Sequence, residues 1–84
     1  MSLESQPGFE LAAVQSKMAR VAIGWGVRDL AKAAGVSANT VSRLEAGDQL
    51  KSGTLAAIRT ALEAAGVTFT NGDEPGVKLK RQHD

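Results

Sequence analysis

The chain has 84 residues, of which none is cysteine or tyrosine, one is tryptophan and one is histidine. The absence of cysteine excludes disulfides and thiolate metal sites. A single histidine, His83 near the end of the chain, leaves no convincing pairing of a nucleophile with a base, and no histidine and acidic residues have metal-ligand spacing. We therefore expect a protein that is not an enzyme and that binds no metal or cofactor.

Long apolar runs are also missing. No segment approaches the roughly 20 apolar residues that span a bilayer, and the first ten residues lack the basic and apolar regions of a signal peptide. These absences predict a cytoplasmic protein with no membrane partner. The net charge is only +1, but residues 17–59 hold seven basic and three acidic residues. Such a local surplus fits a surface that faces the DNA backbone or, alternatively, ordinary solubilising charge.

The most informative segment, residues 27–47, predicts two short helices joined by a tight turn. Gly35 closes the first helix because glycine adopts positive φ at little cost, and Ser37 is a good N-cap for the second. Apolar residues at helical spacing predict a shared core face: Leu30, Ala31, Ala34, Val41 and Leu44. This geometry is the one that places a second helix in the major groove of DNA.

The second helix, predicted over residues 38–46, keeps five side chains away from that core: Ala38, Asn39, Thr40, Ser42 and Arg43. Asparagine pairs with the edge of adenine and arginine with guanine. The hydroxyls of Ser37, Thr40 and Ser42 suit phosphate oxygens. A polar helix face in water is the simpler alternative, but the complete helix–glycine–helix pattern favours DNA.

The segment resembles the helix-turn-helix domains of the phage repressor and Cro type, the XRE family. The matching residues are Arg20, Leu30, Ala31, Gly35, Val36, Ser37, Val41, Ser42, Leu44 and Glu45. The resemblance covers residues 11–65 and implies a mainly α fold, a compact four-helix repressor-like domain that binds double-stranded operator DNA, usually as a homodimer.

The resemblance also assigns roles. By position, Ala38, Asn39 and Arg43 read bases, and Ser42 or Thr40 contacts phosphate. Arg20 on the preceding helix corresponds to an arginine that pairs with the glutamate at Glu45. Two departures weaken one expected phosphate anchor, because Val27 replaces a common glutamine and Gly26 replaces the usual serine or threonine cap. Further backbone contacts are expected from Arg28, Lys32 and Lys51.

Around this motif we expect a flexible tail over residues 1–8 and a helix-turn-helix domain over residues 9–66. A first helix over residues 9–23 has an apolar face that we predict to be buried: Leu11, Val14, Met18, Val21 and Ala22. Trp25 is expected to anchor the core between helices. A last helix over residues 54–65 buries Leu55, Ile58 and Leu62.

Residues 67–80 alternate apolar and polar residues around a turn-rich centre, which predicts two short strands. Because an isolated hairpin is marginally stable, we favour strands that pair between two subunits over a local hairpin on the last helix. The dimerisation residues would be Val67, Phe69, Val77 and Leu79. Residues 81–84 are expected to be disordered.

These observations predict a sequence-specific transcriptional regulator, a dimeric repressor that inserts the helix over residues 38–46 into the major groove. The alternative is an antitoxin or accessory interaction module, in which Phe69 and Leu79 bind a different protein. A stable homodimer would favour the first hypothesis, and a monomer with an exposed apolar tail the second.

Overall fold

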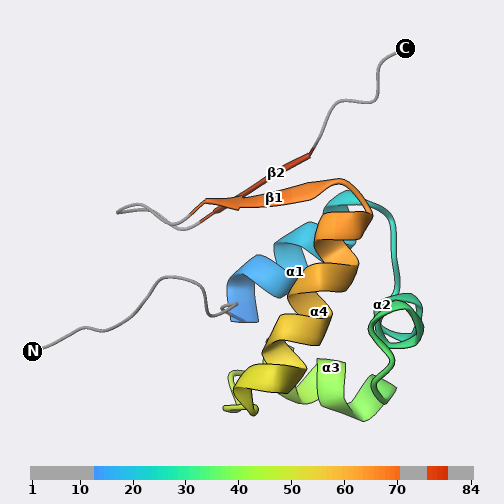
Figure 1. Ribbon diagram of the computed structural model, residues 1–84, viewed down its shortest axis with the longest axis vertical. Coiled ribbons are helices and arrows are strands. Elements are labelled where there is room, and N and C mark those ends of the chain that lie inside the picture. The colour runs from blue at the N-terminus through green and yellow to red at the C-terminus, as the bar shows by residue number, and fades with distance from the viewer. Residues whose placement is uncertain (1–12, 71–75, 80–84) are drawn as a thin grey trace, which may run out of the picture.

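The computed structural model describes residues 13–70 and 76–79, with four helices followed by two strands (Figure 1). The elements are α1 (Ala13–Ala22), α2 (Val27–Ala34), α3 (Ala38–Glu45), α4 (Ser52–Ala64), β1 (Val67–Thr70) and β2 (Gly76–Leu79). The expected fold class, mainly helical with a two-stranded appendage, is confirmed. The tails predicted over residues 1–8 and 81–84 lie outside the described residues, as does Leu11.

The turn between α2 and α3 follows the predicted capping chemistry. Gly35 has a φ of 74°, in the left-handed region, and the next amide, from Val36, donates to the carbonyl of Ala31 at 3.0 Å. The hydroxyl of Ser37 accepts a hydrogen bond from the Thr40 amide at 3.0 Å. Both predicted caps are therefore confirmed, and the chain direction changes within three residues.

Replacing Gly35 with alanine is expected to destabilise the protein by about 1–2 kcal/mol, the usual cost of placing an L-residue in the left-handed region. A Cβ at this position meets nothing within 4 Å, so the cost comes from the backbone alone. Gly53 in α4 is a matched control, because it also has open space but a conformation without positive φ. Gly53→Ala should instead stabilise the helix by roughly 0.5–1 kcal/mol. Urea unfolding measures the free-energy change of both variants. Equal changes would contradict the assignment of the cost to the left-handed backbone at Gly35.

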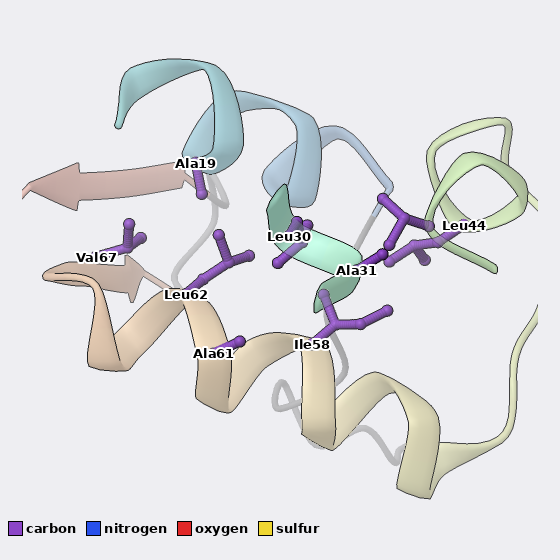
Figure 2. Packing of buried hydrophobic residues seen from close by; sticks show 9 residues of the cluster. Ala19, Leu30, Ala31, Leu44, Ile58, Ala61, Leu62 and Val67 are labelled. Carbon is purple, nitrogen blue, oxygen red and sulfur yellow. The ribbon is translucent and has the colours of Figure 1, made fainter. Parts of the chain in front are cut away.

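The core lies between α4 and the three preceding helices (Figure 2). The fully enclosed side chains include Leu30 from α2, Val41 from α3, and Ile58 and Leu62 from α4. These four agree with the sequence prediction, whereas Leu55 is only half-buried against the core. Trp25 is likewise half-buried and packs against the cluster from the α1–α2 connection.

The predicted buried face of α1 is wrong. Val14 and Val21 are each 59% exposed and Met18 is 42% exposed, while the helix buries Gln15, Ser16 and Ala19 instead. The reason is that the inward side of α1 supplies polar groups to its neighbours. The Ser16 hydroxyl donates to Glu45 at 3.3 Å, and the Gln15 side chain donates to the Gly76 carbonyl at 3.1 Å. The small Ala19 then lets α1 approach the core closely. Ala22, also predicted to be buried, is exposed.

The two strands form an antiparallel hairpin within one chain, with Val67 opposite Leu79 and Phe69 opposite Val77. This is the second of the two arrangements considered for the segment. Val67 belongs to the core, Phe69 and Val77 pack against it, and Leu79 is 52% exposed. The hairpin rests on α1 and the end of α4, so three of its four apolar side chains are engaged within their own subunit. Their role in dimerisation stays a prediction.

Candidate nucleic-acid interface

The recognition-helix candidate α3 is held against the domain along one side only. Val41 and Leu44 are buried, whereas Asn39, Ser42 and Arg43 are exposed. Ala38 differs from these three because it is half-buried and packs against the core. In Figure 1, α3 lies at the lower end of the domain and the hairpin at the upper end. The exposed side of α3 is therefore a surface on which a ligand can be contacted without disturbing the core.

The first turn of α3 presents a pair of hydroxyls. Ser37 Oγ and Thr40 Oγ1 lie 2.8 Å apart, and Ser37 Oγ also accepts the Thr40 amide. Their mutual hydrogen bond uses only one of the two hydroxyl protons, so the other can be donated to an anionic oxygen. Ser42 is exposed one turn further along the helix. The three predicted phosphate-contacting hydroxyls thus lie on or beside one short helix.

Arg43 has a partner that the sequence analysis missed. Its Nε donates to Asp48 Oδ2 at 3.2 Å, and the two side chains are 53% and 52% exposed. Within the described part of the chain the terminal nitrogens of Arg43 have no other partner, and they carry the donors for a bidentate contact. Asp48 therefore holds the guanidinium by one edge. A separation of five residues is not a helical pairing distance, and the contact forms because the chain turns back after Glu45.

Exposed basic side chains are present on the elements before and after α3. Arg28 and Lys32 are exposed one turn apart on α2, and Lys51 is exposed as the N-cap residue of α4. The nearby carboxylate of Asp29 is engaged, because it accepts the Gly26 amide at 2.7 Å. Asp29 thus satisfies the backbone amide of Gly26, which is the half of a capping box that needs no N-cap side chain. An acidic residue three positions after a cap is a known sequence signal that would have predicted this contact.

Arg20 and Glu45 meet as a two-pronged ion pair between α1 and the last turn of α3. Arg20 Nε donates to Glu45 Oε2 and Nη2 donates to Oε1, each at 3.0 Å, while Nη1 donates to the Trp25 carbonyl at 3.0 Å. The side chains are only 13% and 9% exposed. The hydrogen bond to Glu45 raises the pKa of Arg20 against the opposing effect of burial. The pair fixes the position of α3 relative to α1.

Metal ligation and membrane crossing can be described for residues 13–70 and 76–79. These residues contain no group of three histidine, cysteine or acidic side chains that could hold a metal ion. In the same ranges, no helix combines the length and the apolar character needed to cross a membrane.

Comparison with known proteins agrees with the geometry of α2, the turn and α3. A family model described as a helix-turn-helix domain matches residues 12–70, which cover all four helices and β1. Comparisons with curated proteins and with solved structures gave no significant match. A helix-turn-helix domain indicates a DNA-binding regulator. On the extent of this match, the chain belongs to the helix-turn-helix domain family.

Proposed function

We propose that the protein is a sequence-specific transcriptional regulator of the repressor and Cro type, which inserts α3 into the major groove of operator DNA in the cytoplasm. The observation that carries the proposal is the exposed side of α3, where Asn39 and Arg43 project from a helix that is capped at its start and tied to α1 at its end. A rigid support of this kind is what base reading requires, since contacts to base edges depend on position.

In this proposal each side chain has a distinct contact. Asn39 pairs with adenine and Arg43 with guanine, while the half-buried Ala38 offers only its methyl group to a thymine methyl. Ser37, Thr40 and Ser42 donate to phosphates near α3. The cations that hold the flanking backbone are Arg28, Lys32 and Lys51.

The operator is expected to be an inverted repeat read by a homodimer. A two-fold dimer with two copies of α3 predicts half-sites about one helical turn apart, roughly 10 base pairs from centre to centre. We assign repression as the outcome because occupying an operator requires no surface beyond the DNA interface and the contact between subunits.

Selection from a pool of random duplex DNA tests this function. The purified full chain is expected to enrich an inverted repeat, and the selected duplex should bind at least tenfold more tightly than a scrambled duplex of the same length at one salt concentration. Equal affinity for both duplexes, with binding that disappears at moderate salt, would reduce the interaction to non-specific attraction and contradict the proposal.

Asp48→Asn is expected to increase affinity for DNA several-fold, or about 0.5–1 kcal/mol, because it removes a negative charge beside the DNA backbone. Folding should change little, since the ion pair is half-exposed. Titration of the selected and scrambled duplexes measures the effect. Because a charge effect carries no sequence information, both affinities should rise together. A fall in affinity for the selected duplex alone would show instead that Asp48 is needed to orient Arg43.

A further inference from the structure

The outer side of α1 is an apolar surface that residues 13–70 and 76–79 leave exposed. Val14, Met18 and Val21 project from it, and they line a shallow hollow together with Lys17, Ala22 and the hairpin residue Val77. Leu79, which is 52% exposed, adds an apolar side chain from β2 beside the half-buried Val77, and β2 lies against α1. We name Val14, Met18, Val21, Val77 and Leu79 the α1 face. The largest apolar patch on a small domain is often functional.

The spacing along α1 fits a second copy of the same helix. Val14 and Val21 lie four residues before and three residues after Met18, the alternating separation that forms a helix-pairing seam. If two such helices cross antiparallel at Met18, Val14 of each copy lies opposite Val21 of the other. A two-fold interface requires this self-complementarity, in which two residues exchange roles between subunits.

The size of the patch predicts a weak dimer. The four side chains of the α1 face other than Val77 are each about half exposed. They amount to a few hundred Å² per subunit, below the ~800 Å² that each partner buries in a standard interface. Association should therefore be reversible and dependent on concentration. The α1 face also lies apart from the exposed side of α3, because α1 meets α3 through its opposite side at Ser16 and Arg20. Pairing through this face leaves both copies of α3 uncovered.

The effect of salt should distinguish this dimer from binding to DNA. Among the described residues, Lys17 is the one charged residue that lines the hollow, and Ala13–Ala22 contain no acidic residue to pair with it across a two-fold axis. Its aliphatic stem can cover apolar surface while the ammonium group stays in water. The two Lys17 side chains repel each other, so added salt should strengthen the dimer. Binding to DNA responds in the opposite direction.

We propose that the α1 face, rather than exchange of the hairpin strands, is the surface through which two copies of this chain form a reversible dimer. Only the role assigned to the dimer, which is to join two half-sites, rests on the proposed function. The surface and its self-association are testable without DNA.

Sedimentation equilibrium from about 1 µM to about 1 mM, at low and moderate salt, tests the proposal. The full chain should pass from monomer to dimer in this range, more readily at the higher salt. Met18→Glu places two like charges near the two-fold axis and should weaken association at least tenfold. Val21→Glu should weaken it similarly, whereas Ala56→Glu on the exposed side of α4 is a matched control that should not.

The side chains of Met18 and Val21 are exposed in the single subunit, so circular dichroism and thermal unfolding of the dilute variants should match the parent. A wild-type chain that remains monomeric at the highest concentration would overturn the proposal and leave a different protein as the occupant of the face. A dimer that survives both glutamate substitutions would also overturn it. Loss of the dimer in these variants, with single half-site binding retained, separates the interface from the DNA-binding function. If the wild-type chain forms this dimer but binds no selected duplex, only the proposed function fails.

Discussion

Replacing Arg20 with alanine should lower the free energy of unfolding by about 3 kcal/mol, the usual scale for breaking a buried ion pair by removing one partner. In a domain of this size that loss corresponds to a fall in melting temperature of roughly 12–24 °C. The effect is large because the substitution removes three hydrogen bonds together, two to Glu45 and one to the Trp25 carbonyl. It also leaves Glu45, only 9% exposed, with the Ser16 hydroxyl as its remaining described partner.

Urea unfolding of Arg20→Ala, Glu45→Ala and the double variant measures the coupling between the two side chains. Arg20→Lys should lie between wild type and Arg20→Ala, because an ammonium group keeps the charge but not the two-pronged geometry. Asp48→Asn is the matched control for an exposed pair and should cost less than about 1 kcal/mol. An unchanged melting temperature for Arg20→Ala would contradict the structural role of the pair.

The direction of the Arg20 pKa shift limits the pH at which this stabilisation is lost. Glu45 raises the pKa of Arg20 in the folded protein. A raised folded-state value gives stability that is fully present below the unfolded pKa and is lost only as pH rises through the folded value. For arginine both values lie in strongly alkaline solution. The titration of Arg20 should therefore leave the free energy of unfolding independent of pH near neutrality.

Replacing Arg43 with alanine should weaken binding to the selected operator by about 1–3 kcal/mol and abolish preference at one base pair in each half-site. The expected base is guanine, because the free terminal nitrogens of Arg43 suit its two major-groove acceptors. Folding should be retained, since the side chain is 53% exposed and its ion pair with Asp48 lies at the surface. The loss should therefore appear in binding and not in the unfolding curve.

Fluorescence anisotropy on the operator and on single-base variants separates base reading from backbone contact. Lys32→Ala is the matched control, because it removes an exposed cation from α2 without touching α3. It should weaken binding to every duplex by a similar factor and reduce the magnitude of the salt dependence by about one unit. If Arg43→Ala behaves like Lys32→Ala, then Arg43 contacts phosphate and the base-reading assignment is wrong.

Local rules explain why the helix-turn-helix segment could be predicted from sequence. Gly35 and Ser37 are recognised by backbone chemistry that acts within four residues. The helices α2 and α3 each have only one apolar side, and this side must bury Leu30 in α2 and Val41 in α3. The start of α4 is less well predicted, because helix propensity changes little between Ser52 and Thr54; the structure begins the helix at Ser52. The predictions for the caps and for the buried sides of α2 and α3 do not depend on the rest of the fold.

The side of α1 that faces the core could not be derived in the same way. An apolar stripe at Val14, Met18 and Val21 has the same period whether it meets the core of its own chain or another molecule. The deciding groups are Ser16 and Arg20, whose partner Glu45 is more than 20 residues away in the chain. The family resemblance predicted the contact of Arg20 with Glu45, but no local pattern predicted the contact of Ser16. The Arg43–Asp48 contact was missed for a related reason, because it depends on the path of the chain after α3 ends.

The most direct test of base reading by α3 is a parallel selection from random duplex DNA with the wild-type chain and Asn39→Ala. The side chain of Asn39 is exposed, so its removal should leave the fold intact. We predict that the variant enriches the same inverted repeat with preference relaxed at one position in each half-site, where the wild type selects adenine. An unchanged motif, or an equal loss of affinity on all sequences, would contradict the reading of DNA by this helix.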